Sequence, residues 1–146
     1  VKIDLYGLIQ PGYEEWLENL IKENSSIVEY KGIIDFDKTV EYLQQYFALL
    51  FPTYYYGEGF PGNVVDAYNT GLPIIATDWL YNKDVIKNGR NGILVPVKNS
   101  KAIAEAVLEL YNDRNMHLEM AKNCLEDSKQ YNPDEVLKEF YLEIEK

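Results

Sequence analysis

Two carboxylates flank a turn of small residues near the middle of the chain. Glu58 and Asp66 belong to the stretch GEGFPGNVVDAYNTGLPIIAT, residues 57–77, in which a loop leads into a short helical segment and then an apolar segment. The first turn of a helix carries backbone N–H groups that have no partner inside the helix, and these groups favour an anion. The carboxylates must serve another purpose, because each would repel an anion that approached it directly.

The loop itself has the composition of an anion-binding turn. Gly57, Gly59 and Gly62 lack a Cβ atom, so the backbone can approach a ligand closely. The N–H groups near Asn63 and Val64 would face the same ligand, and the helix dipole makes a phosphate or diphosphate the natural guest. The sequence therefore predicts a local phosphate site on an otherwise acidic chain.

The two acids suit the sugar part of such a ligand. An ionised carboxylate only accepts hydrogen bonds, and it can receive them from neighbouring sugar hydroxyls at about 1.5–3 kcal/mol each. Phosphate on the amides and hydroxyls on Glu58 and Asp66 together indicate a nucleotide sugar. Taken alone, Glu58 could equally be a solvated loop acid, and Asp66 could simply stabilise the helix N-terminus.

Strands and helices are expected to alternate along the chain, because the spacing of apolar residues switches repeatedly between periods of two and about 3.6. The expected strands cover residues 1–7, 26–32, 47–53, 72–77 and 92–97. The expected helices cover residues 10–24, 37–46, 63–70, 82–89, 100–113, 115–130 and 133–146. Asp37 is the expected N-cap of the second helix, and Pro133 marks the start of the last.

The segment FALLFPT, residues 47–53, is apolar on both faces of its expected strand. Such strands are typical of parallel sheets covered by helices on both sides. We therefore predict an α/β fold with one Rossmann-like, doubly wound parallel sheet, in a single domain that spans residues 1–146. Ligands of such sheets bind at the carboxyl ends of the strands, and the loop that carries Glu58 lies at one of these ends.

The composition excludes several classes of partner and site. A formal net charge of -10 argues against a nucleic-acid-binding surface, which needs clustered Lys and Arg. Cys124 is the only cysteine, so no internal disulfide and no cysteine-based metal cluster can form, and a reducing cytoplasm is favoured. The longest apolar runs are shorter than the roughly 20 residues of a membrane-spanning helix. The opening VKIDLYGLIQ lacks the pattern of a signal peptide.

The loop and its surroundings resemble the retaining GT-B glycosyltransferases of family 4. The signature of that family has two acidic residues separated by seven others, followed by a small residue, Gly-Leu-Pro and an apolar strand, and Glu58 and Asp66 have this spacing. Further segments fit in the same order, namely LYG, YKGII, LLFPT, NGRNGILV and KAIAEAVLELYND. The resemblance covers nearly all of the chain.

The resemblance implies a C-terminal, nucleotide-sugar-binding domain of a hexosyltransferase that needs no metal and no other cofactor. Glu58, the catalytic candidate, would contact the sugar hydroxyls near the reacting carbon, and Asp66 would bind the ribose diol. The residues between them would hold the sugar and the diphosphate of the donor, namely Gly59, Phe60, Pro61, Gly62, Asn63 and Val64. Asp66 departs from the family, in which the second acid is usually a glutamate.

The resemblance also implies that the chain is a fragment. The family's domain normally opens with a strand and a helix that supply an Arg and a Lys to the donor phosphates, and an acceptor-binding domain precedes it. Neither has a counterpart before VKIDLYG. The absent strand would be central in the order 3-2-1-4-5-6, which would leave unpaired strand edges. We therefore expect the fragment alone to be inactive and either to self-associate or to have low stability.

The expected reaction is the transfer of a hexose from a UDP- or GDP-sugar to a saccharide or lipid-linked acceptor, in the biosynthesis of a cell-surface polysaccharide or glycoconjugate. The acceptor would bind through the absent N-terminal domain. The enzyme is expected in the cytoplasm, with membrane association of the full-length form left open. The alternative is a non-catalytic, flavodoxin-like binding or regulatory module, although no acid pair follows the first strand. A nucleotide-sugar epimerase or a glycan phosphorylase is a third reading, but no segment supplies the pyridoxal-phosphate lysine of the latter.

The remaining reactive or aromatic side chains are expected to have structural roles. Tyr54, Tyr55 and Tyr56 should pack at the end of their strand rather than stack on a base. His117 should lie at a surface or a helix end, and Cys124 should pack between helices, since no second cysteine or histidine motif accompanies it.

Overall fold

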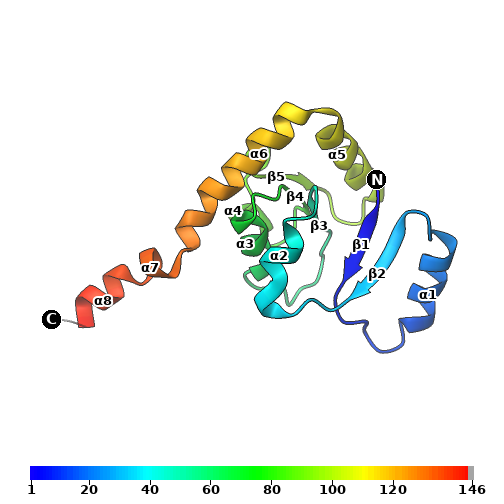
Figure 1. The fold of residues 1–146 in the computed structure, drawn as a ribbon, viewed down its shortest axis with the longest axis horizontal. Helices are drawn as coiled ribbons and strands as arrows, with labels where there is room; N and C mark the ends of the chain where they lie inside the picture. Colours follow the sequence, from blue (N-terminus) through cyan, green and yellow to red (C-terminus); the bar gives the residue numbers. More distant parts are fainter. Residues whose placement is uncertain (145–146) are drawn as a thin grey trace. The chain divides into compact units, whose positions relative to one another are not determined.

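The structure, a computed structural model, describes residues 1–144 of the 146-residue chain. Contacts within the chain divide it into two compact units, Val1–Thr39 and Val40–Lys146. Each unit contains parallel strands and helices, drawn in Figure 1. The single domain over residues 1–146 that we expected from the sequence stays a prediction.

The first unit is a β-α-β arrangement. Strand β1 (Ile3–Tyr6) pairs in parallel with β2 (Val28–Gly32), and helix α1 (Glu14–Glu23) connects them. Helix α1 begins four residues after the predicted start, because Gly12 adopts a φ of 92° that a helix cannot continue through. None of the residues described in this unit is fully buried.

The helix predicted at residues 37–46 has a different start. Asp37 lies inside a 3₁₀ turn, Phe36–Lys38, whose N-cap position is Asp35, so the prediction of Asp37 as an N-cap is wrong. Helix α2 (Thr39–Leu43) follows this turn directly. A short polar residue can begin or end both a 3₁₀ turn and an α-helix, so the sequence alone does not show which of them Asp37 belongs to.

The second unit contains a three-stranded parallel sheet in the order β3-β4-β5. Its strands are β3 (Leu49–Phe51), β4 (Ile74–Thr77) and β5 (Gly92–Val95). Every residue of β4 is buried, as expected for a central strand with helices on both faces. The parallel pairing is confirmed, but the five strands form two sheets where the sequence predicted one.

The helices of the second unit follow the predicted order with shifted ends (Figure 1). They are α3 (Gly62–Asn69), α4 (Asn82–Val85), α5 (Ser100–Asn112), α6 (Arg114–Asp127), α7 (Pro133–Val136) and α8 (Lys138–Ile144), with a 3₁₀ turn at Ser128–Tyr131. Asp113 separates α5 from α6, since its carboxylate accepts the N–H of Met116 at 2.9 Å and caps α6. Pro133 begins α7 as predicted, but α8 is a separate helix.

Two apolar clusters cover the two faces of β4. Ile74 and Ala76 pack with buried residues of α3, whereas Ile75 packs on the other face with Leu110 of α5 and Met120 of α6. Successive residues of a strand point to opposite faces, so this alternation places helices on both sides of the sheet. The α/β, doubly wound, Rossmann-like fold class predicted from the sequence is confirmed.

A polar cluster ties the end of α6 to the turn before β5. The guanidinium of Arg90 donates to both carboxylate oxygens of Asp127, at 2.8 and 3.1 Å, and Asn91 Nδ2 donates to Asp127 Oδ2 at 2.8 Å. The Arg90 guanidinium holds the pKa of the Asp127 carboxyl below its usual value. This bidentate pairing fixes the register of α6 on the sheet.

Candidate functional site

The loop between β3 and α3 carries the predicted site at the carboxyl end of β3. Two hydrogen bonds tie this loop to the end of the neighbouring strand β4. The hydroxyl of Thr77 donates to the carbonyl oxygen of Thr53, and the indole Nε1 of Trp79 donates to the carbonyl oxygen of Tyr55 at 3.0 Å. The loop is therefore held at the edge of the sheet where α/β folds bind ligands.

Glu58 is half-buried and is fixed within this loop by its carboxylate. Thr53 Oγ1 donates to Glu58 Oε2 at 2.9 Å, and the N–H of Tyr55 reaches the same hydroxyl at 3.3 Å. The N–H of Glu58 donates to the carbonyl oxygen of Tyr55 at 3.2 Å and closes the turn. A carboxylate offers about four acceptor positions, so one bond from Thr53 leaves capacity for ligand hydroxyls.

The three loop glycines differ in what the fold requires of them. A Cβ atom at Gly57 would lie 2.5 Å from Cε1 of Tyr55, so the tyrosine ring occupies that space. At Gly59 and Gly62, such a Cβ would meet no described atom within 4 Å apart from those of the adjacent residues and the backbone of α3, and neither residue has a left-handed φ. Folding therefore does not require glycine at these two positions, and the open space lets a ligand approach the backbone.

Helix α3 presents an open N-terminus next to this space. Its N-cap residue, Pro61, makes no side-chain capping bond, and the first two helical residues, Gly62 and Asn63, are exposed. Val64 anchors the same turn, because its side chain is fully buried and its N–H donates to the carbonyl oxygen of Pro61 at 3.0 Å. The Val64 N–H, expected to face the phosphate, is therefore already engaged, and among the described residues no group caps the N–H groups of Gly62 and Asn63 at the positive end of the helix dipole.

Asp66 lies in the next turn of α3. It lies four positions after Gly62, so the two share one face of the helix. Asp66 is half-buried, and burial raises the pKa of its carboxyl above the usual value. The structure thus brings the predicted residues onto one loop and the first two turns of one helix. Their contacts with a donor stay predictions.

Phe60 differs from its neighbours in the loop because its ring contacts a residue far along the chain. The Phe60 ring lies 5.5 Å from the ring of Tyr131, which follows α6, and the Phe60 side chain is 61% exposed. A contact of Phe60 with a donor stays a prediction. The Phe60 side chain links the loop to the 3₁₀ turn after α6.

The sequence analysis did not identify Thr53, Thr77 and Trp79, whose hydrogen bonds hold the loop in place. It was also wrong about the three tyrosines: Tyr54, Tyr55 and Tyr56 do not pack at the strand end but are 55%, 70% and 83% exposed. The available signal was the run of four aromatic or polar residues, TYYY, directly after an apolar strand. Exposed rings beside a glycine loop are typical of a binding surface rather than of a core.

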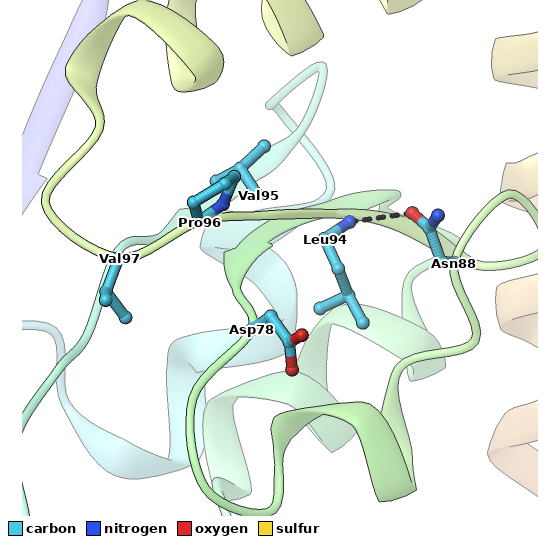
Figure 2. Close-up of a pocket in the computed structure, with 6 residues that line it drawn as sticks. All are labelled: Asp78, Asn88, Leu94, Val95, Pro96 and Val97. Carbon is cyan, nitrogen blue, oxygen red and sulfur yellow. Dashed lines mark hydrogen bonds between the residues drawn. The ribbon is translucent and has the colours of Figure 1, made fainter.

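A cavity of about 540 Å³ opens at the carboxyl ends of β4 and β5. Figure 2 shows its walls, which are formed by Asp78, Asn88, Leu94, Val95, Pro96 and Val97. Asn88 Oδ1 accepts the N–H of Leu94 at 2.9 Å, and this bond holds one wall in place. None of the predicted donor-site residues lines this cavity, so it is a hollow separate from the Glu58 loop.

His117 and Cys124 have the structural roles that the sequence predicted. His117 Nε2 lies 2.8 Å from the carbonyl oxygen of Phe47, and the two rings stack at 4.1 Å near the start of α6. Cys124 is fully buried, and burial raises the pKa of its thiol to about 12. A thiol with that pKa stays protonated at neutral pH and is a poor nucleophile.

The first 113 residues match the family described as "Glycosyl transferases group 1". The chain belongs to this family. Among curated relatives of this group 1 glycosyl transferase chain is the N,N'-diacetylbacillosaminyl-diphospho-undecaprenol alpha-1,3-N-acetylgalactosaminyltransferase of Campylobacter jejuni. It is 31% identical over 121 residues, which are 83% of this chain and 31% of the relative.

A second relative is named for capsular polysaccharide biosynthesis. The capsular polysaccharide biosynthesis glycosyltransferase CapM of Staphylococcus aureus is 27% identical over 103 residues, which cover 70% of this chain and 26% of the relative. This glycosyl transferase chain therefore spans about a third of the length of the Campylobacter relative and about a quarter of CapM.

Solved glycosyltransferase structures share the fold. Anabaena HepE in complex with UDP superposes with a TM-score of 0.84 at 17% identity, covering 99% of this chain and 40% of HepE. The pneumococcal O-GlcNAc transferase GtfA in complex with UDP and GlcNAc superposes with a TM-score of 0.80 at 24% identity, covering 99% of this chain and 29% of GtfA. These likenesses show that the group 1 chain has the fold of a GT-B glycosyltransferase domain.

Within residues 1–144 of this glycosyl transferase chain, no group of three or more His, Cys, Asp or Glu side chains is placed to hold a metal ion. In the same part of the chain, every helix is too short or too polar to cross a membrane. The expectation that the enzyme needs no metal stays a prediction.

Proposed function

We propose that this chain is the nucleotide-sugar-binding domain of a retaining hexosyltransferase. The donor is a UDP- or GDP-linked sugar, and the acceptor is a saccharide or a lipid-linked saccharide of a cell-surface polysaccharide or glycoconjugate. The observation that carries the proposal is the loop from Glu58 to Asp66. It combines a fixed carboxylate, unfilled space at Gly59 and Gly62, and the uncapped start of α3.

The geometry suggests how the donor is divided among these groups. The diphosphate lies against the first amides of α3, where the helix dipole favours negative charge. The sugar lies on the side of Glu58, whose carboxylate accepts its hydroxyls, and the ribose diol lies on the side of Asp66. Asp66 is one methylene shorter than the glutamate usual in the family, but it keeps the charge and the acceptor oxygens.

The reaction would move the sugar from phosphate oxygen to acceptor oxygen. The bond from the anomeric carbon to the diphosphate breaks, and its electron pair stays on the diphosphate. The acceptor oxygen forms the new bond, and its proton passes to the departing phosphate oxygen. The amides of α3 stabilise the charge that develops on the diphosphate, and Glu58 positions the sugar. Because these groups supply the electrostatic stabilisation, we propose that the domain uses no metal or other cofactor.

Relatives and neighbours support the substrate classes. The name of the Campylobacter relative includes a diphospho-undecaprenol-linked sugar, and that of CapM includes a capsular polysaccharide. HepE has been solved with UDP and with UDP-glucose. A UDP-linked donor therefore has more support than a GDP-linked one. A cytoplasmic location rests on the single cysteine, and self-association of the isolated chain stays a prediction.

A donor panel tests the proposal. The full-length protein is incubated with UDP- and GDP-linked hexoses, and release of the nucleoside diphosphate is measured for the wild type and for Glu58→Gln. We expect one donor to be turned over and Glu58→Gln to lower kcat/KM by about 10- to 100-fold, which corresponds to the loss of one or two charge-assisted hydrogen bonds.

Glu105→Gln is the matched control, since Glu105 lies on the exposed face of α5 and forms a surface ion pair with Lys101, at 3.6 Å. It should leave kcat/KM unchanged. Turnover of none of the donors, or equal turnover by the wild type and Glu58→Gln, would reject the proposed function.

A further inference from the structure

An aromatic shelf lies beside Glu58 and is not used by the donor contacts proposed above. We define it as the rings of Tyr55, Tyr56 and Trp79. The Tyr56 and Trp79 rings meet edge to face, with centroids 4.9 Å apart and an interplanar angle of 72°. Tyr55 and Tyr56 are 70% and 83% exposed, so their faces are open to solvent.

The shelf is held in place by the backbone beneath it. The Trp79 indole is tied by its Nε1 to the carbonyl oxygen of Tyr55, and the Tyr55 ring fills the space above Gly57. These contacts couple the rings to the same turn that fixes Glu58. A ligand that stacks here would therefore meet a surface already arranged, and would lose little free energy in ordering it.

The first tyrosine of the run, Tyr54, already contacts another side chain. Lys98 Nζ lies 5.3 Å from the centroid of the Tyr54 ring, which is within the range of a cation–π contact. Tyr54 is consequently left out of the shelf, and its ring serves instead to hold Lys98, whose φ of 55° is uncommon for a residue with a side chain. The exposed rings are those of its two successors, and Trp79 is the partly buried member of the shelf.

We propose that the shelf binds a pyranose ring of the saccharide acceptor, and thus adds a contact from this domain to those expected from the N-terminal domain. A pyranose has one face of C–H groups, and these pack on the electron-rich faces of aromatic rings. Its hydroxyls point outward, where Glu58 and the tyrosine O–H groups can accept or donate hydrogen bonds. The chain's net charge of -10 and the Glu58 carboxylate next to the shelf disfavour a phosphate or anionic headgroup there.

The position of the shelf selects the acceptor over the donor base. In the proposed donor arrangement, Asp66 holds the ribose and Glu58 holds the sugar, so the base lies beyond Asp66. Tyr56 lies two residues before Glu58 and thus at the sugar end of the donor. The inference rests on the proposed function in this one respect, because it takes the orientation of the donor from it.

The test uses the full-length protein and simple methyl glycosides as probes: methyl α-glucopyranoside, methyl α-galactopyranoside and methyl N-acetyl-α-glucosaminide. Tyr56→Ala removes the most exposed ring without opening the core, and Tyr56→Phe keeps the ring. Tyr111→Ala is the matched control, since Tyr111 is a 62% exposed tyrosine on α5. Saturation-transfer NMR measures glycoside binding without donor, and steady-state kinetics measures transfer and donor hydrolysis.

We expect at least one glycoside to bind the wild type, Tyr56→Phe and Tyr111→Ala. Tyr56→Ala should weaken this binding and raise the acceptor KM by at least 10-fold, while donor KM and hydrolysis of the donor by water change less than twofold. An unchanged acceptor KM in Tyr56→Ala would overturn the inference. So would a joint loss of donor binding, or a shift in oligomeric state alone, which would identify a donor-binding or protein-binding surface instead.

The NMR arm separates this inference from the proposed function. If no nucleotide sugar is bound or turned over but a glycoside binds and Tyr56→Ala abolishes that binding, the proposed function fails and the shelf stands. If donors are turned over and Glu58→Gln impairs turnover, but no glycoside or acceptor depends on Tyr56, the proposed function stands and the shelf is rejected.

Discussion

Glu58 depends on a neighbour for its position. Its carboxylate accepts a hydrogen bond from the hydroxyl of Thr53 at 2.9 Å. The backbone carbonyl oxygen of Thr53 in turn accepts a hydrogen bond from the hydroxyl of Thr77. The side chain and the backbone of Thr53 thus have separate tasks, one toward the acid and one toward β4. A substitution can remove the first and leave the second in place.

Thr53→Val should impair catalysis with little effect on folding. The valine keeps the shape of the side chain and the backbone bond to Thr77 but no longer orients Glu58. We expect kcat to fall by about 10- to 150-fold, in keeping with about 1.5–3 kcal/mol for a hydrogen bond to a charged group. Thr53→Ser keeps the hydroxyl and should stay within a factor of two. Steady-state kinetics that fail to separate the two variants would contradict this role.

Asp66→Asn should weaken donor binding and stabilise the fold. The donor should bind about 5- to 150-fold more weakly, which corresponds to about 1–3 kcal/mol for hydrogen bonds to a carboxylate. Burial raises the folded-state pKa of Asp66, so the unfolded chain releases its proton first as pH rises, and stability declines across that interval. The neutral amide removes this decline. Thermal unfolding without donor should therefore occur at a higher temperature at pH 7 in Asp66→Asn, and a lower one would contradict the account.

At the residue scale, the sequence predicted the groups that carry charge but not the groups that orient them. The spacing of Glu58 and Asp66 and the glycines between them were visible as a pattern. The roles of Thr53 and Trp79 depend on the path of the loop, because each bonds to a backbone carbonyl or a carboxylate brought near by the turn. The tyrosines were misjudged because a strand-end position is compatible with both packing and exposure.

Gly92 and Gly62 differ in whether the fold leaves room for a side chain. A Cβ at Gly92, the first residue of β5, would lie 2.4 Å from the carbonyl oxygen of Ile74 in β4 and 2.9 Å from Cγ2 of Ile86. Backbone atoms of a paired strand cannot yield, so this glycine serves the close approach of β5 to β4. Gly62 meets no described atom within 4 Å and serves no such approach.

Gly92→Ala should therefore destabilise the fold, whereas Gly62→Ala should not. We expect a loss of about 2–3 kcal/mol for Gly92→Ala, typical of overpacking a core. Gly62→Ala should change the free energy of unfolding by less than about 0.5 kcal/mol, since its backbone is one that alanine can adopt. Urea denaturation monitored by circular dichroism measures both. Similar losses in the two variants would show that the start of α3 is packed rather than open.

At the element scale, the alternation of strands and helices was predictable, but several ends were not. The periodicity of residues 133–146 is continuous, so it gave no sign that α7 ends at Val136 and α8 begins at Lys138. The capping residues Asn99 and Asn132 do lie where helices start, because their side chains accept the N–H groups of the first turn. Ends with a capping side chain are easier to place than ends without one.

The burial of the chain is uneven at the scale of the whole molecule. The fully buried apolar side chains all fall between Leu43 and Cys124, in the second unit. The described residues of the first unit, Val1–Thr39, contribute partly buried side chains only. Local stability follows the density of buried apolar contacts, so the two units should open with different free energies.

Amide hydrogen exchange should show this difference directly in the 146-residue chain. We expect the amides of β4 to exchange at least about 100-fold more slowly than those of β1 and β2, because opening β4 exposes both apolar clusters. Mass spectrometry of peptic fragments resolves the three strands. Equal protection of the strands would show that the two units unfold as one.

The fold class was predictable because it follows from the order of elements, and family membership agrees with it. The division into two sheets, β1-β2 and β3-β4-β5, is compatible with the unpaired strand edges that the resemblance led us to expect. The family match also disfavours the non-catalytic regulatory module, which the sequence had left open. The central claim that remains is that the start of α3 and its loop hold a nucleotide sugar.

Isothermal titration calorimetry of the full-length protein with UDP- and GDP-linked hexoses tests that claim most directly, with wild type and Gly62→Ala compared side by side. The account predicts that one donor binds the wild type and that Gly62→Ala weakens this binding at least 10-fold while its unfolding transition is unchanged, because the added methyl group occupies the space for the diphosphate. Binding of no nucleotide sugar, or equal affinity in the two proteins, would contradict it.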